Sequence, residues 1–191
     1  MHKNRKILLL ISIFILTGFM HSAASEINVK ESLRHTPIDL SKSGAKKIFR
    51  KYNFYDGHRN QGGSFENNFV DNADGTVSDL ATGLMWQKGG SDEALTVNAG
   101  KGYVEKLNHD AFAGYSDWYI PTIEELSTIM EEKKYGRLHL DEVFSRKQTN
   151  SISSDTSGTL SYWFSHFVGG AIGWHYILGN YYVKAVRQIK E

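Results

Sequence analysis

The chain contains no cysteine among its 191 residues. This absence excludes disulfides, thiolate nucleophiles, cysteine-ligated zinc and iron–sulfur clusters. Proline is also rare, at 2 residues, whereas there are 18 Gly, 4 Trp, 10 Tyr and 10 Phe. Many glycines and aromatics favour short strands joined by glycine turns over a helical bundle. Stability must therefore come from a core of ordinary size and from hydrogen bonds.

A strong excess of one charge is missing as well, since 22 Lys+Arg face 21 Asp+Glu. General nucleic-acid binding depends on neutralising phosphates with an excess of cations, so we expect no nucleic-acid partner. The sequence predicts no cofactor, and it leaves the oligomeric state open.

The first 24 residues have the three-part pattern of a secretory signal peptide. A cationic head (2–6) without acids precedes an apolar stretch (7–16), and small residues (22–24) allow cleavage before Ser25. The apolar part is about ten to fourteen residues long, whereas a membrane span needs about twenty. We expect an exported protein, periplasmic or extracellular, with no membrane span after cleavage; an uncleaved anchor is the alternative.

Residues 25–66 are predicted to form an N-terminal extension with a basic amphipathic helix and a linker. Apolar residues recur at helical spacing behind Ser41 or Ser43, either of which can cap the helix. They are Ala45, Ile48, Phe49 and Tyr52. The opposite face carries five cations, Lys42, Lys46, Lys47, Arg50 and Lys51. This face is either a solvated helix surface or a docking site for an acidic partner.

A β-hairpin is predicted where Asp74-Gly75 separates two short β-prone pairs, because Gly75 tolerates the positive φ of such turns. The same segment suggests calcium as a weak alternative, with Asp71, Asn72 and Asp74 as ligands. Valine occupies the leading ligand position of that template, at Val70, and cannot bind a metal. We therefore predict no metal site.

Further elements follow from periodicity. One helix is predicted over residues 97–107, and a second begins with the capping-box pair Thr122 and Glu125 and ends near Lys133-Lys134. Aromatic runs split by glycine predict short strands in the last third of the chain. These runs are residues 162–164, 167–168, 174–177 and 181–183, followed by a closing strand within 182–187.

Three motifs, in order along the chain, resemble one bacterial family. They are Asn-Phe-Val-Asp-Asn-Ala-Asp-Gly-Thr-Val at 68–77, continuing to Gln87; Gly-Tyr-Ser-Asp-Trp at 114–118, followed by Pro121-Thr122 and Glu125-Leu126; and Tyr-Tyr-Val-Lys-Ala-Val-Arg at 181–187. Together they resemble the Legionella collagen-like protein C-terminal domain family. In their context Trp86 and Trp118 are predicted core anchors, and Asp117 with Arg187 a polar pair.

The resemblance implies an α+β, C-type-lectin-like fold. Two main helices would pack on twisted antiparallel sheets with long loops, over residues 67–188, with the helical extension added before them. It also implies an exported protein that binds extracellular partners, since the namesake family is associated with adhesion to sulfated glycosaminoglycans. Tyr119 and Ile152 depart from the family's usual arginine and tryptophan. The calcium-site motifs of lectins are absent, so calcium-dependent sugar binding does not transfer with the fold.

The leading functional hypothesis is a non-catalytic binding module for a glycan or another envelope or extracellular partner. Sugar faces stack on aromatic rings, and residues 162–182 hold eight aromatics. Because strand aromatics usually build the core, we expect at least half of these eight to be buried. The candidate ligand-binding residues are Trp163, His166, Trp174, His175, Tyr176 and Tyr181.

Two alternatives belong to other functional classes. A structural or accessory component of an envelope assembly would dock through the basic helix. A hydrolytic enzyme would need paired carboxylates or a nucleophile set. Acids such as Glu124 and Glu125 are expected on a helix surface, and no nucleophile-elbow motif frames Ser165 in a set with His166 and Asp155.

Overall fold

The computed structural model describes residues 28–190, so the predicted signal peptide at 1–24 lies outside the described residues. The helices are α1 Val29–Ser32, α2 Lys42–Lys51, α3 Val97–His109 and α4 Ile123–Thr128, with a short 3-10 turn η1 at Phe112–Gly114. The strands are β1 Phe69–Asp71, β2 Thr76–Asp79, β3 Leu84–Gln87, β4 Asn150–Thr156, β5 Ser161–His166, β6 Ala171–Tyr176 and β7 Val186–Gln188. Within this range no helix has the length and apolar character needed to cross a bilayer.

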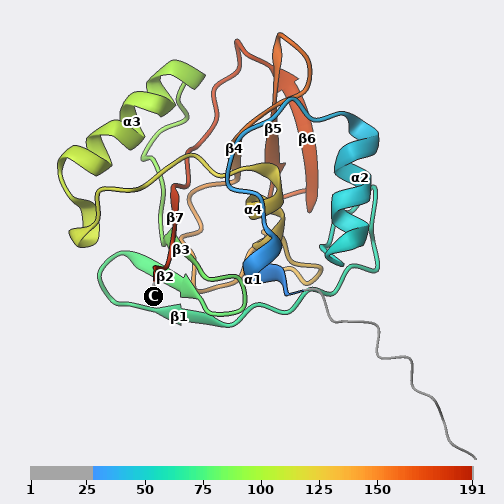
Figure 1. The fold of residues 1–191 in the computed structure, drawn as a ribbon, viewed down its shortest axis with the longest axis horizontal. Helices are drawn as coiled ribbons and strands as arrows, with labels where there is room; N and C mark the ends of the chain where they lie inside the picture. Colours follow the sequence, from blue (N-terminus) through green and yellow to red (C-terminus); the bar gives the residue numbers. More distant parts are fainter. Residues whose placement is uncertain (1–27, 191) are drawn as a thin grey trace, which may run out of the picture.

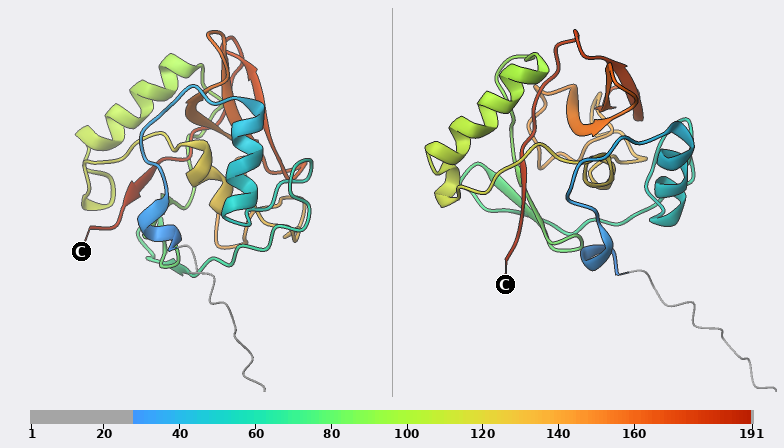
Figure 2. Two further views of the ribbon diagram at one scale, coloured as in Figure 1. Left: turned by 45° about the vertical axis from the view of Figure 1, so that its right-hand side comes forward. Right: turned by 45° about the horizontal axis from the view of Figure 1, so that its top comes forward.

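The strands form two antiparallel sheets, in the orders β1-β2-β3-β7 and β4-β5-β6. The α+β class predicted from the sequence is therefore confirmed. Helices α2 and α3 lie on opposite sides of the molecule, with α4 between them (Figures 1 and 2). Helix α2 stands beside the β4-β5-β6 sheet, on the side of β6 (Figures 1 and 2).

The β1–β2 hairpin and two predicted helices form where the sequence placed them. The hairpin turn holds Ala73 at φ 59° and Gly75 at φ 89°, the left-handed region that Gly75 was expected to supply. Helix α2 begins behind Ser41, whose Oγ accepts a hydrogen bond from the N–H of Gly44 at 3.1 Å. Helix α3 begins behind Thr96, whose side chain likewise accepts a backbone N–H.

Helix α4 carries the predicted capping box, but its predicted end at residues 133–134 is wrong. It stops at Thr128, because the chain turns away and the N–H of Glu131 bonds to the carbonyl of His139 at 3.1 Å. All six residues of α4 are buried. The expectation that Glu124 and Glu125 lie on a helix surface is therefore also wrong.

The last third of the chain differs from the prediction in three places. The predicted strand at 167–168 lies in the turn between β5 and β6, where Gly170 at φ 62° reverses the chain. The closing strand is limited to Val186–Gln188, and residue 181 forms only an isolated bridge with Leu95. Strand β4 was not predicted, because its sequence is mostly polar.

The predicted N-terminal extension and the main body share one hydrophobic cluster. Phe49 and Phe54 are fully buried in it, together with Trp86 and Trp163. Trp118 is buried in a second, smaller cluster, so both tryptophans predicted as core anchors are confirmed. Burying a phenylalanine of this kind contributes about 2–3 kcal/mol, which holds α2 firmly on the sheet.

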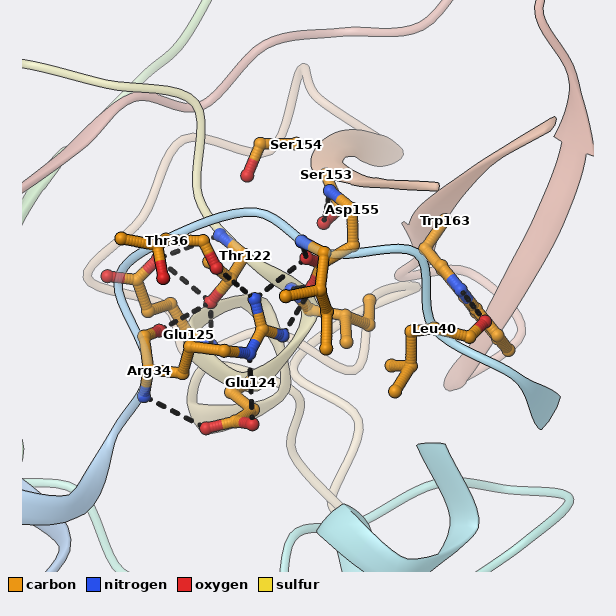
Figure 3. Close-up of polar contacts among 12 residues, drawn as sticks. Arg34, Thr36, Leu40, Thr122, Glu124, Glu125, Ser153, Ser154, Asp155 and Trp163 are labelled. Atoms are coloured by element: carbon orange, nitrogen blue, oxygen red, sulfur yellow. Dashed lines mark hydrogen bonds and ion pairs between the residues drawn. The ribbon is translucent and has the colours of Figure 1, made fainter. Parts of the chain in front are cut away.

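A buried carboxylate, Asp155 on β4, fixes the chain just before α2. Arg34 Nη1 and Nη2 donate to its two oxygens at 2.8 and 2.7 Å (Figure 3). The backbone N–H groups of Ile38 and Ile123 donate to the same carboxylate at 2.7 and 2.8 Å. Arg34 also lies 3.4 Å from Glu124, through Nε. One arginine thus links the N-terminal segment to α4 and β4.

A second buried carboxylate, Glu125, lies beside the first (Figure 3). It accepts hydrogen bonds from the N–H of Thr122 at 2.7 Å and the hydroxyl of Tyr119 at 2.6 Å, and His35 Nδ1 lies 2.8 Å away. Burial, and then the neighbouring Glu125 charge, raise the pKa of Tyr119 far above its ordinary value. We call Arg34, His35, Glu124, Glu125 and Asp155 the polar hub.

Candidate functional site

The start of α2 is attached to the β4-β5-β6 sheet by main-chain bonds. The N–H of Leu40 donates to the carbonyl of Thr156 at 2.8 Å, and the N–H of Thr156 donates to the carbonyl of Ile38 at 3.0 Å. The indole Nε1 of Trp163 donates to the carbonyl of Leu40 at 3.0 Å (Figure 3). These bonds join the segment just before α2 to β4 and β5.

The basic face of α2 is exposed, as all five cations predicted for acidic-partner docking lie on the surface. Lys42 Nζ stands 3.7 Å from the centre of the Trp174 ring, and Lys51 Nζ donates to the hydroxyl of Tyr52 at 2.7 Å. The structure therefore brings together one predicted docking cation, Lys42, and one predicted ligand-binding aromatic, Trp174.

The six candidate ligand-binding residues divide into core and surface. Trp163 is fully buried and Tyr181 is 7% exposed, so both belong to the core. Trp174 is 37% and Tyr176 66% exposed, and His166 and His175 are exposed too. Trp163 supports Trp174 edge to face, with ring centres 5.6 Å apart.

The expectation that at least half of the eight aromatics are buried is wrong. Only Trp163, Phe167 and Tyr181 are buried among them. Trp174 and Tyr176 are exposed because they lie on β6, an edge strand with no further strand of the described chain against its outer side. Tyr162, Phe164 and Tyr182 are partly buried.

The segment after α2, predicted to be a linker or long loop, is a tight loop bound to β6. Asp56 is fully buried, and its carboxylate accepts hydrogen bonds from the N–H of Arg59 at 2.7 Å and of Ile172 at 2.8 Å. Arg59 Nη1 donates to the carbonyl of Ile172 at 2.7 Å and lies 3.3 Å from Asp56. An aspartate that bonds backbone groups two and three residues on is a recognisable turn signal, which sequence reasoning missed.

An open pocket of about 610 Å³ lies along β6 between this loop and the sheet. Its polar and aromatic lining comes from His58, Arg59, Phe164, His166 and Trp174. Among the described residues that line it there is no carboxylate. We call this pocket, with Lys42 at its rim, the β6 groove. It combines cationic groups with an exposed ring and suits an acidic ligand that has a flat face.

The hydrolase set is not assembled in the structure. Asp155 is taken up by Arg34 and backbone groups, while Ser165 is buried and its Oγ donates to the carbonyl of Ser151 at 3.3 Å. His166 is exposed in the β6 groove and has no hydrogen bond to Ser165 or Asp155 in the described part of the chain. These three residues have no nucleophile–base–acid geometry.

The weak metal alternative uses oxygens that already stabilise the hairpin. Asp71 pairs with Lys88 at 2.5 Å, and Asp74 accepts a hydrogen bond from the N–H of Thr76 at 3.0 Å. Asn72 bonds Thr76 through its side chain. Over residues 28–190, no group of three or more His, Asp or Glu side chains is arranged to hold a metal ion.

The predicted polar pair of Asp117 and Arg187 is confirmed. Arg187 Nε donates to Asp117 at 2.6 Å, and its guanidinium lies 3.8 Å from the centre of the Tyr115 ring. The hydrogen bond from Arg187, aided by Lys190, lowers the pKa of Asp117 to about 2. This pair joins β7 to the segment before α4 and lies away from the β6 groove.

Comparison with protein families gives one match. The model of a family described as the Lcl C-terminal domain matches residues 75–187, more than half of the chain. This match confirms the resemblance drawn from the three motifs. Neither the curated proteins nor the solved structures contain a match to the chain.

Proposed function

Because the chain belongs to the Lcl C-terminal domain family, we propose that it is an exported, non-catalytic module that binds an acidic partner. The partner is a glycan, or another component of the envelope or extracellular space, that carries carboxylates or sulfates. The β6 groove is the binding site. The proposal also includes a C-type-lectin-like arrangement of the two sheets and helices, in which loops rather than reactive groups meet the ligand.

One observation carries the proposal: the exposed ring of Trp174 lies under Lys42 and beside Arg59 in the β6 groove. Lys42 Nζ is 3.7 Å and the Arg59 guanidinium carbon 5.7 Å from the ring centre. An aromatic face favours stacking of an apolar sugar face, and nearby cations add charge-assisted hydrogen bonds to acidic substituents. A ligand with both features gains from both contacts at once.

The charge around the groove supports an acidic ligand. No Asp or Glu occurs between Asp39 and Asp56, so the whole of α2 is free of acids. Asp39 is engaged through its carboxylate by the N–H of Gly158 at 2.7 Å, and Asp56 by Arg59. Exposed cations in one place attract anionic ligands over a distance of about one Debye length, roughly 8 Å at physiological salt.

Absence of catalysis is part of the proposal and follows from the groove's chemistry. Glycoside hydrolysis requires two carboxylates roughly 5–10 Å apart. No carboxylate lines the groove within the described residues, and the carboxylates of the polar hub are occupied by protein donors. Binding without turnover is the function that these side chains support best.

The test uses heparin as an acidic glycan probe and purified protein expressed from the full chain. Trp174→Ala and Lys42→Glu should each weaken heparin binding by about tenfold, equivalent to about 1.4 kcal/mol. Lys134→Glu is the matched control, because Lys134 is exposed and belongs to a different part of the surface. Binding should also weaken as salt is raised. Wild-type protein that passes a heparin column at low salt without retention would contradict the proposal.

The accessory-component alternative has its own observation. Lys46, Lys47 and Arg50 are exposed, and none of them has an ion pair among residues 28–190. If this part of α2 docks an acidic envelope protein, Lys46→Glu with Arg50→Glu should abolish that association. Retention on heparin would then persist, since Lys42, Arg59 and Trp174 are intact.

A further inference from the structure

Strand β6 forms the edge of the β4-β5-β6 sheet. It pairs with β5 without a bulge, from His166 opposite Ala171 to Ser161 opposite Tyr176. An edge strand presents a row of N–H and C=O groups on its free side, which can pair with another chain.

Contacts at Ile172 identify which residues turn their main chain outward. Its N–H and C=O bond to Asp56 and Arg59, and so both point away from β5. In an antiparallel pair, residues alternate between bonding the neighbouring strand and facing away from it. Trp174 and Tyr176, two and four residues further on, therefore face outward as well. Ile177 fits the alternation, since its N–H bonds back to the carbonyl of Leu160 at 2.9 Å.

The chain covers only the first part of this edge. Gly57 N–H donates to the carbonyl of Gly170 at 2.8 Å. Asp56 accepts the N–H of Ile172, and Arg59 donates to its carbonyl. Beyond Ile172, the outward N–H and C=O of Trp174 and the N–H of Tyr176 have no partner in the described part of the chain. The carbonyl of Tyr176 accepts the N–H of Gly179 at 3.1 Å.

We propose that the open edge at Trp174 and Tyr176 receives an extended acidic peptide segment of a partner protein, which adds to the sheet as a further strand. This inference rests on the proposed function, because it specifies the acidic partner of the same groove. Main-chain hydrogen bonds supply affinity in this mode of recognition, and pockets beside the edge supply specificity.

The acidic character of the peptide follows from the cations along the edge. Lys42 and Arg59 both lie close to the ring of Trp174. His58 and His166 line the groove. The chain's own Asp56 shows how an acid fits here. Its carboxylate accepts the outward N–H of Ile172 while pairing with Arg59 at 3.3 Å. A partner carboxylate or carbonyl at the N–H of Trp174 would repeat this contact about 7 Å along the strand.

The experiment compares two synthetic octapeptides on the full-chain protein, one alternating Glu and Val and one alternating Lys and Val. Only the Glu-Val peptide should bind. In hydrogen exchange followed by NMR, it should slow the amides of Trp174 and Tyr176 by about tenfold or more. The amides of Gly173 and His175 face β5 and should change little.

A proline variant separates main-chain pairing from charge attraction. Tyr176→Pro removes only an outward N–H, which an edge position tolerates. It should bind the Glu-Val peptide about tenfold more weakly than the ring-loss control Tyr176→Ala. His175→Pro removes an N–H that faces β5 and should instead lower the thermal midpoint, which verifies the alternation.

The outcomes distinguish this inference from the proposed function. If heparin is retained but neither peptide binds, or if Tyr176→Pro binds the Glu-Val peptide as well as Tyr176→Ala does, the peptide-strand inference is overturned and the proposed function stands. Equal binding of the Lys-Val peptide also overturns it. If heparin is not retained, the proposed function fails, whether or not the Glu-Val peptide binds.

Discussion

The polar hub and the loop beside the β6 groove contain the same pair of groups, an arginine and a buried aspartate, bonded in two different ways. Each sets an arginine against a fully buried aspartate, Arg34 against Asp155 and Arg59 against Asp56. In the hub, both Nη atoms of Arg34 bond Asp155 and its Nε lies near Glu124. In the groove, Arg59 bonds through Nη1 alone, and its Nε and Nη2 have no hydrogen-bond partner in the described part of the chain.

The difference separates a structural polar cluster from the proposed binding site. A buried charge without partners costs several kcal/mol, so a cluster that only stabilises the fold must be closed on itself. The carboxylates and the Arg34 Nη atoms of the hub meet that condition, whereas Arg34 Nε lies 3.4 Å from Glu124 without a hydrogen bond. The groove does not, since a half-bonded arginine, an unpaired main-chain N–H and an exposed ring lie together beside open space. A ligand can supply what the chain leaves unpaired there.

The largest effect on stability is expected in the polar hub. Asp155→Ala removes the acceptor of four donors and the bidentate partner of Arg34, which keeps Glu124 at 3.4 Å, so the free energy of unfolding should fall by about 3–5 kcal/mol. Urea unfolding measures this loss. Asp39→Ala is the control, as its carboxylate is exposed and should cost less than about 1 kcal/mol. Equal losses in the two variants would mean that the hub contributes little to stability.

The second prediction concerns a buried lysine whose hydrogen-bond partners are backbone carbonyls rather than a carboxylate. Lys184 Nζ donates to the carbonyls of Gln87 and Lys88 at 3.2 and 3.1 Å, and to that of Gly89, and burial lowers its pKa from 10.5 to about 7. The unfolded chain therefore binds more protons than the folded chain between these two values. The free energy of unfolding should rise from pH 7 to pH 10, by on the order of 1 kcal/mol per unit.

Lys184→Met is the matched variant for that slope. It keeps an unbranched side chain of similar length in the buried position and removes the titrating group. Urea unfolding at several pH values should give a flatter profile than that of the wild type. An unchanged slope in the variant would assign the pH dependence to other groups.

A smaller effect is expected at the pair of partly exposed Asp117 and buried Arg187. The pKa of Asp117 is lowered to about 2, so its contribution is complete above pH 4 and is lost as the pH falls toward 2. Solvent screens this pair, so Asp117→Asn should cost only about 1 kcal/mol at pH 7. The two proteins should converge in stability at pH 2. A difference that persists there would point to packing rather than charge.

Local signals predicted the elements that depend on short-range chemistry. Ser41, Thr122 with Glu125, and Gly75 each act through bonds or dihedral angles within four residues, and each forms the expected cap or turn. The family resemblance predicted the pair of Asp117 and Arg187, 70 residues apart, which no local rule supplies.

The parts that the sequence did not predict depend on distant partners. Strand β4 reads as a polar stretch, and it is buried because Asp155 meets Arg34, 121 residues away. Glu125 is buried for the same reason, because it pairs with His35, which is 90 residues away. The groove combines Lys42, Arg59 and Trp174, and only the first and last were candidates. Arg59 was missed because the pairing of Asp56 with the edge of β6 cannot be read from the local sequence.

The smallest effect on stability is expected at the exposed side chains of β6. Tyr176 is 66% exposed, so Tyr176→Ala should change the free energy of unfolding by no more than about 0.5 kcal/mol. The ring of Trp174 packs edge to face against Trp163. Trp174→Ala should therefore lower the free energy of unfolding by more, about 1 kcal/mol. Urea unfolding of both variants gives the two values. If Tyr176→Ala lost more than 1 kcal/mol, the outer part of β6 would already be packed against the fold. Its unpaired main chain would then be no more available than the hub, and the contrast between closed and open arginine–aspartate pairs would no longer identify a binding site.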